Sequence, residues 1–158
     1  MQKKITTFLT YGDRAEEAME FYTSIFPDSR IVSTTRYGQA GPGPEGSLMT
    51  GTFELAGQEF MALNGGSSFS FAQGISLFVD CETQDEVDAY WEKLSEGGEK
   101  GPCGWLTDKF GVSWQIVPRV LIEMQGDEDP EKANRVMEAM LQMGKIEIEG
   151  LRQAYEAG

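Results

Sequence analysis

The chain has 158 residues, of which 40% are hydrophobic, and 13 Lys and Arg against 26 Asp and Glu give it a formal net charge of −13. A chain of this length predicts a single globular domain with a sizeable buried core. The acidic excess argues against nucleic acid and anionic membranes as partners, because binding to either depends on clustered Lys and Arg.

The first half of the chain predicts a strand, a helix and three further strands. Ile5–Tyr11 alternates as a strand does, and Arg14–Phe26 has apolar residues at spacings of three and four, as in an amphipathic helix. Pro27 ends that helix, and Gly57 predicts a tight hairpin between the last two strands. The three further strands are predicted at Arg30–Tyr37, Leu48–Leu55 and Glu59–Leu63.

The same pattern then starts again. A shift of 68 positions pairs apolar residues of the first strand and helix with later ones, such as Leu9 with Leu77, and a shift of 54 pairs Phe60 with Trp114. We therefore predict two copies of a β-α-β-β-β unit. The elements of the second copy are predicted at Ile75–Asp80 (strand), Gln84–Glu96 (helix), around Trp105 (strand) and Val112–Val117 (strand).

The residues after Pro118 have a helical pattern. Asp127-Glu128-Asp129-Pro130 resembles a helix start, because acidic residues suit the positive end of the helix dipole and Pro suits the first turn. Further helix is predicted to Met143 and over Ile146–Tyr155, packed on the domain or on a partner subunit. We divide the chain into one domain at 1–120, with modules at about 1–66 and 72–120, and a helical extension at 121–158.

The sequence contains no histidine and two cysteines, Cys81 and Cys103. Without His there is no Ser-His-Asp triad, Cys-His dyad or HExxH zinc site. The cysteines do not form a C-x-x-C pair, and we expect both to be reduced. No apolar run reaches the ~18–20 residues that span a bilayer, and Met1–Lys4 leads directly into a strand-like segment, so we expect a cytoplasmic protein.

Four stretches of the sequence resemble a known family. They are FLTYGDRAEEAMEFYTSIFPDSRI, SLFVDCETQDEVDAYWEKLSEGG, CGWLTDKFGVSWQIVP and DPEKANRVMEAMLQMGKIEIEGLRQAY. These stretches are similar to the PhnB-like branch of the vicinal oxygen chelate superfamily, the glyoxalase and bleomycin-resistance fold, a branch also named after 3-demethylubiquinone 3-methyltransferase. The resemblance implies an α+β fold of two βαβββ modules whose sheets curl around a shared cavity, and assembly as a homodimer.

In metal-using members of the superfamily, a His or carboxylate occupies each of four equivalent strand positions. Motif alignment places these positions at Thr6, Met61, Gly74 and Gln115. Gly has no side-chain ligand, the Met thioether is a soft donor, and Thr and Gln offer weak neutral oxygens. We therefore expect no metal ion, no cofactor and no glyoxalase-type mechanism, in which a bound cation polarises the substrate.

Strand alternation assigns side chains to the two faces of each sheet. Under the helices we expect Ile5, Leu9, Tyr11, Ile75, Leu77, Val79, Trp114 and Ile116. The cavity side is then aromatic and hydroxylic, which suits an uncharged or weakly polar ligand with an aromatic or planar part. A closed core around Phe8, Met61 and Phe78 is the alternative. The predicted ligand-binding residues are Thr6, Phe8, Met61, Ser76, Phe78, Cys103, Trp105 and Gln115.

Three side chains near the inferred pocket have reactive groups. Asp108 and Glu59 can act as general bases if desolvation raises their pKa, but solvated surface charge is the interpretation that we favour. A nucleophilic Cys103 needs a nearby cation to lower its pKa, and Lys100 and Lys109 are the local candidates. We favour a structural role for this cysteine.

The sequence leaves three functions open. We expect first a metal-independent small-molecule-binding protein, whose negative charge favours cationic ligands at long range. The second is an enzyme, either a methyltransferase, as the name of the family suggests, or a metal-free isomerase or lyase. No Gly-rich strand-to-helix loop suits the adenosyl cofactor of a methyltransferase. The third is a dimeric interaction module that uses the helices from Pro130 onward.

Overall fold

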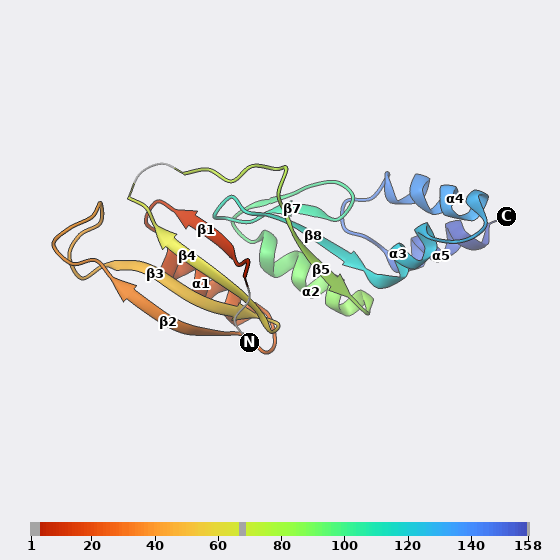
Figure 1. The fold of residues 1–158 in the computed structure, drawn as a ribbon. Helices are drawn as coiled ribbons and strands as arrows, with labels where there is room; N and C mark the ends of the chain where they lie inside the picture. The colour runs from red at the N-terminus through yellow and green to blue at the C-terminus, as the bar shows by residue number, and fades with distance from the viewer. Residues whose placement is uncertain (1–3, 67–68, 158) are drawn as a thin grey trace. The chain divides into compact units, whose positions relative to one another are not determined.

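The computed structural model describes residues 4–66 and 69–157 (Figure 1). The chain forms two compact units, residues 1–70 and 71–158, and each contains one four-stranded sheet. Within the part of the chain that the structure describes, no helix has the length and the apolar character needed to cross a membrane.

The first unit is a sheet of four strands with one helix packed on it. The strand order is β1-β4-β3-β2, with β1 parallel to β4 and the other neighbours antiparallel. A two-residue turn at Ala56 and Gly57, both with positive φ, joins β3 to β4, as is typical of a hairpin whose turn matches the twist of the strands. The elements are β1 (Thr7–Tyr11), α1 (Ala15–Ile25), β2 (Arg30–Arg36), β3 (Leu48–Leu55) and β4 (Gln58–Asn64).

The core of the first unit lies between α1 and one face of the sheet. The helix buries Ala15, Ala18, Met19 and Tyr22. A Cβ atom at Gly51 would lie 2.4 Å from the Met19 sulfur, so the helix approaches β3 closely where this strand lacks a side chain. The sheet contributes Leu9, Tyr11, Phe53, Phe60 and Ala62, all buried.

The second unit repeats the arrangement and adds three helices. Its strand order is β5-β8-β7-β6, with β5 parallel to β8, and the Thr83 hydroxyl caps the start of α2 by accepting a hydrogen bond from Glu86 N. The elements are β5 (Leu77–Cys81), α2 (Gln84–Ser95), β6 (Glu99–Lys100), β7 (Trp105–Thr107), β8 (Ser113–Pro118), α3 (Arg119–Gln125), α4 (Pro130–Met140) and α5 (Ile148–Glu156).

The pairing register confirms the two βαβββ modules but corrects their alignment. Phe8 pairs with Met61 in the first module, and Phe78 pairs with Gln115 in the second. Since Met61 and Gln115 are 54 positions apart, the first strands must be matched with a shift of 70, as from Phe8 to Phe78. The predicted shift of 68 was wrong by two residues, which preserves the face of each side chain. The counterpart of Thr6 is therefore Ser76 and not Gly74.

The helices cover the sheet faces largely as predicted, with two exceptions. Leu9, Trp114 and Ile116 are buried. Ile5 and Ile75, expected under the helices, are instead 86% and 77% exposed. Both residues precede their strands by two positions, because β1 and β5 begin later than the alternation indicated.

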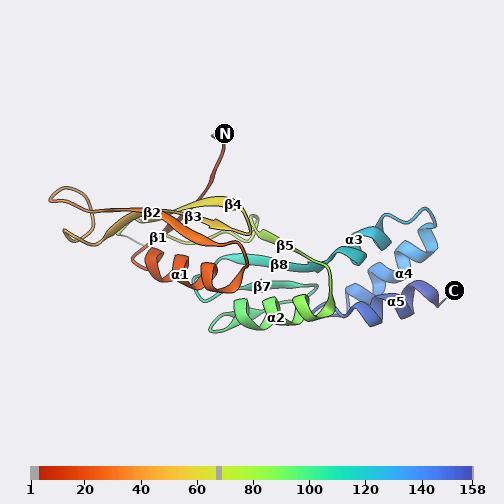
Figure 2. The ribbon, with the colours of Figure 1, turned by 90° about the horizontal axis from the view of Figure 1, so that it is seen from below.

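The C-terminal extension, α3 to α5 with its connections, belongs to the second unit and packs against the end of β8. The three helices lie together beyond the end of β8 (Figure 2), and their hydrophobic core contains residues of β8 and of all three helices. The sequence did not predict α3, which begins directly after β8. Tyr155 Oη donates to Asp127 Oδ2 over 2.6 Å and so links α5 to the loop before α4. The core consists of Val117, Leu121, Met124, Val136, Ile146 and Leu151.

Asp108 is a structural residue and not a solvated charge, which corrects the favoured interpretation. Its side chain is 2% exposed. Oδ1 accepts hydrogen bonds from Phe110 N and Val112 N, and Oδ2 accepts one from Trp114 Nε1 over 2.9 Å. The carboxylate thereby satisfies buried donors in the connection between β7 and β8.

We expect Asp108→Ala to lower the free energy of unfolding by about 2–4 kcal/mol, because it leaves buried N–H groups without an acceptor. Urea denaturation followed by circular dichroism measures this loss. The matched control is Asp13→Ala at an exposed position, for which we expect a change within about 0.5 kcal/mol. Equal stability of the two variants would contradict the role given to Asp108.

Candidate functional site

The second sheet has an open face on the side away from α2. Phe78, Gln115 and Trp105 are aligned across β5, β8 and β7 by their pairing. Leu106 and Trp114, on the opposite face, are buried. Gln115 Nε2 donates to Ser76 Oγ over 3.0 Å. The structure thus brings together four of the predicted residues on one face, where the Phe78 side chain is 51% exposed.

A cavity of about 480 Å³ lies beside this face, and we call it the Trp105 pocket. Trp105 and Thr107 are alternate residues of β7, and Ser113 pairs with Thr107. Within the described residues, no hydrogen bond pairs the hydroxyl of Thr107 or Ser113 with another protein group; Ser113 is only 4% exposed, and Thr107 is the more accessible of the two. The main lining residues are Gln73, Gly101, Pro102, Trp105, Thr107 and Ser113.

The charged groups at this pocket are largely neutralised or exposed. Glu99 and Lys100 also line it. Lys100 Nζ lies 3.0 Å and 3.2 Å from the two carboxylate oxygens of Glu92, which offsets its charge. Glu99 lies exposed on the short strand β6. The uncharged part of the lining consists mainly of the Trp105 indole, the hydroxyls of Thr107 and Ser113, and the Gln73 amide.

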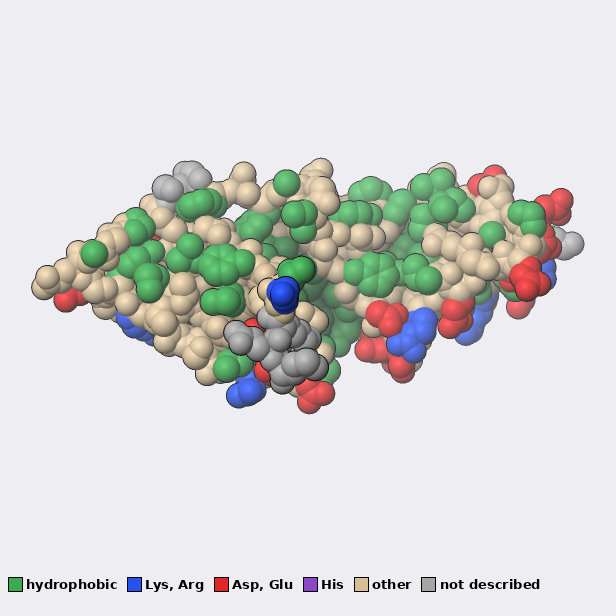
Figure 3. Space-filling view, in the orientation of Figure 1, with side chains coloured by type: hydrophobic (Ala, Val, Ile, Leu, Met, Phe, Trp, Pro, Cys, Tyr) green, Lys and Arg blue, Asp and Glu red, His purple; other side chains and the backbone are tan. Residues whose placement is uncertain are grey.

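The predicted residues of the first unit lie on the open face of its sheet. Phe8 pairs with Met61, which in turn pairs with Thr52 of β3. Phe8 is 48% exposed, and Thr6 is half-buried just before β1. Hydrophobic side chains appear on the first unit in this view, among backbone and side chains that carry no charge (Figure 3). Glu59 lies exposed at the start of β4.

The residues at the four inherited ligand positions do not fit a divalent cation. With the corrected register these are Thr6, Met61, Ser76 and Gln115. Their donors are two hydroxyls, a thioether and an amide, and Ser76 and Gln115 bind each other. Carboxylates and imidazoles, which bind such ions well, are missing from the four positions. Across residues 4–66 and 69–157, no group of three or more His, Cys, Asp or Glu side chains is placed to hold a metal ion.

The two cysteines lie in different environments. Cys81 ends β5 and is fully buried, and this burial, together with Glu86 and Asp80, raises the pKa of its thiol to about 12. Cys103 is half-buried in a turn next to the Trp105 pocket but is not among its lining residues. The Cys81 thiol is therefore protonated at neutral pH and unreactive.

We expect one thiol per native chain to react with Ellman's reagent at neutral pH, and two after unfolding in guanidinium chloride. Cys103 reacts first because it is accessible, whereas Cys81 is buried and un-ionised. The Cys103→Ser variant should show no fast reaction in the native state. A fast reaction that survives in this variant would contradict the assignment.

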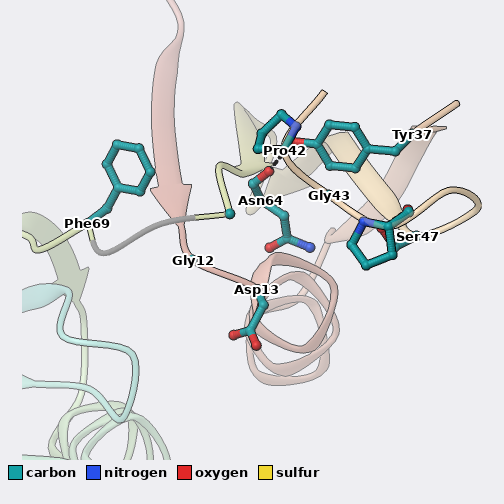
Figure 4. A pocket seen from close by; sticks show the side chains of 10 residues that line it. Gly12, Asp13, Tyr37, Pro42, Gly43, Ser47, Asn64 and Phe69 are labelled. Atoms are coloured by element: carbon teal, nitrogen blue, oxygen red, sulfur yellow. Dashed lines mark hydrogen bonds between the residues drawn. The ribbon is translucent and has the colours of Figure 1, made fainter. Parts of the chain in front are cut away.

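The first unit contains a second cavity, of about 660 Å³, that the sequence analysis missed (Figure 4). Asp13 and Phe69 lie on one side of it, and Pro42 and Tyr37 on the other. Its polar groups mainly hold the fold: Tyr37 Oη donates to Asn64 O, and Asn64 Oδ1 accepts from Ala15 N over 2.8 Å. The Gly-Pro run Gly41-Pro42-Gly43-Pro44, which follows Tyr37, is the one signal of this cavity in the sequence.

The two modules, each with its outer first strand parallel to its last, define the glyoxalase/bleomycin-resistance fold of the vicinal oxygen chelate superfamily. The family model for 3-demethylubiquinone-9 3-methyltransferase matches residues 3–117, and the chain belongs to this family. The resemblance found in the first three stretches is thereby confirmed, whereas the fourth, residues 129–155, lies beyond the matched residues. None of the curated proteins compared matches the chain.

Three solved structures illustrate the relationship. The PhnB protein from Bacillus cereus is 45% identical over 73% of this chain and 99% of its own, with a TM-score of 0.67. PA1353 from Pseudomonas aeruginosa is 19% identical over 74% and 98%, with a TM-score of 0.61. The fosfomycin resistance protein FosX from Listeria monocytogenes is 16% identical over 78% and 98%, with a TM-score of 0.54. The last two support the fold alone.

Proposed function

We propose that this protein binds an uncharged or weakly polar small molecule with an aromatic or planar part in the Trp105 pocket, without a metal ion. The lining of the pocket carries this proposal. The indole of Trp105 offers a flat apolar surface, and the hydroxyls of Thr107 and Ser113 offer hydrogen bonds at one side. A volume of about 480 Å³ suits a small ligand, since such sites usually measure about 300–1,000 Å³.

The charge distribution supports a ligand without a strong negative charge. Lys100 already contacts Glu92, and both side chains are exposed, so that water screens the charge that Lys100 could offer to a ligand anion. The net charge of −13 repels anions at long range. An aromatic, neutral molecule loses little hydration on entering such a pocket, and an indole contact repays that loss.

The donor chemistry supports metal-independent binding. Thr6, Met61, Ser76 and Gln115 supply no charged ligand at the inherited positions, and the bond between Ser76 and Gln115 occupies groups of both residues. A cation held there would have no carboxylate to offset the cost of its desolvation. Binding in the pocket would then depend on the indole and the hydroxyls.

We expect wild-type protein to bind the neutral planar dye Nile red, and Trp105→Ala to raise the dissociation constant by about tenfold or more, as truncation of a central aromatic contact does. A fluorescence titration measures both values. Phe69→Ala, which removes an aromatic ring from the cavity of the first unit, is the matched control and should bind normally.

Dialysis against EDTA should leave the affinity of the wild-type protein for the dye unchanged. A loss of binding that returns with a divalent ion would refute metal independence. Failure of the wild-type protein to bind the dye, or an equal effect of Phe69→Ala, would refute the assignment of the pocket.

Methyl transfer is the second candidate, and the description of the family favours it. Enzymes that use S-adenosylmethionine commonly hold it at a Gly-rich turn between a strand and a helix. Here the turn from β1 to α1 is Gly12-Asp13-Arg14 and the turn from β5 to α2 is Glu82-Thr83. Neither turn is rich in glycine, and the acidic side chains in both turns would repel the carboxylate of S-adenosylmethionine.

We expect equilibrium dialysis with labelled S-adenosylmethionine to show no retention by the wild-type protein. The physical reason is the lack of a glycine-rich backbone cradle at either strand-to-helix turn. A methyltransferase known to bind this cofactor serves as the positive control. Saturable retention by this protein would favour the enzyme over the binding protein.

A further inference from the structure

A tight turn, Pro102 to Trp105, separates the Trp105 pocket from the C-terminal extension. Gly101, Pro102 and Trp105 line the pocket. Gly101 N donates to Trp105 O over 2.8 Å, and Trp105 N donates to Pro102 O over 3.0 Å. These two bonds close the turn, so the position of the indole depends on the position of the turn as a whole.

The other side of the turn is bound by the extension. Cys103 N donates to Met143 O and Gly104 N donates to Gly144 O, both over 2.8 Å. Cys103 and Gly104 have φ values of 57° and 84°, in the left-handed region. A cysteine adopts this conformation at an energetic cost, so contacts with its surroundings must stabilise it. The two carbonyl groups of the extension supply that constraint.

Ile146 packs directly behind the turn. It is fully buried, and a Cβ atom at Gly104 would lie 3.1 Å from Ile146 Cγ1 and 2.9 Å from Ile116 O. The turn is thus in close contact with the extension on one side and with β8 on the other. No side chain fits between them, which leaves the turn little freedom to move.

The segment around Ile146 is itself fixed to α2. Gln84 Nε2 donates to Ile146 O over 3.0 Å, and Gln84 Oε1 accepts from Ile148 N over 2.7 Å. Lys145 Nζ lies 2.9 Å from Asp88 Oδ1. Residues 143–148 therefore connect a rigid helix of the second module to the turn that carries Trp105.

We propose that residues 143–148 position the Trp105 pocket, with Ile146 as the central positioning residue. This segment lies beyond residue 117, where the match to the family model ends, and the Bacillus cereus match leaves about a quarter of this chain without a counterpart. The extension would therefore adjust the shape of the pocket in this chain. As far as ligand selection is concerned, the inference rests on the proposed function.

The test compares Ile146→Ala with Val136→Ala, a second fully buried residue of the extension that is not part of residues 143–148. The readout is the rate at which Cys103 reacts with Ellman's reagent in native protein, which needs no ligand. We expect Ile146→Ala to raise this rate roughly tenfold, because it frees the turn locally, and to change the near-ultraviolet circular dichroism spectrum, to which Trp105 contributes together with Trp91 and Trp114. Val136→Ala should change neither by more than about twofold.

Two further variants keep the test decisive. Ile146→Val should restore the wild-type rate, because it fills most of the same space. Gln84→Ala, which removes the two hydrogen bonds from Gln84 to the segment and leaves the pair of Lys145 and Asp88, should raise the rate even if Ile146→Ala does not fold. Equal rates for Ile146→Ala and Val136→Ala at matched stability, or an unchanged rate for Gln84→Ala, would overturn the proposal.

Nile red binding then separates this inference from the proposed function. If both hold, Ile146→Ala weakens dye binding several-fold while Val136→Ala does not. If the wild-type protein does not bind the dye, the ligand proposal fails, but the reactivity of Cys103 still decides whether residues 143–148 hold the turn.

Discussion

In each module the first strand is hydrogen-bonded in parallel to the last, and the rest of the architecture depends on this pairing. Two parallel strands cannot be joined by a hairpin, so the chain must cross over the sheet, and α1 and α2 cover one face in doing so. The opposite face is left without a helix of its own module. The registers Phe8–Met61 and Phe78–Gln115 then decide which side chains occupy that open face.

Local sequence patterns, which involve residues a few positions apart, predicted much of this fold. Alternation placed Leu9 and Trp114 under the helices because the period of a strand is local. It could not show where β5 begins, and Ile75 was therefore assigned wrongly. The shift of 68 failed because apolar residues in two similar patterns match at several offsets. The role of Asp108 depends on a turn that brings Trp114 back to it, and no local pattern encodes that contact.

The candidate site was predictable in character but not in position. Trp105 was predicted to bind the ligand, whereas Thr107 was missed because its position opposite Ser113 depends on the register between β7 and β8. Three of the four inherited ligand positions, Thr6, Met61 and Gln115, were assigned from the sequence, whereas Gly74 was assigned in place of Ser76 because the shift between the first strands was wrong. Membership in the family establishes the fold, whereas the reaction or ligand depends on the side chains of the site.

The absence of any spacer between β8 and α3 has a consequence for how this protein can be divided. Pro118 ends the strand and Arg119 begins the helix, while Val117 already belongs to the core of the extension. A chain that ended at residue 117, where the family match ends, would expose apolar side chains of this core. It would also leave the backbone N–H groups of Cys103 and Gly104 without their acceptors. The last forty or so residues are thus an inseparable part of the second module's folding unit, and not an appendage.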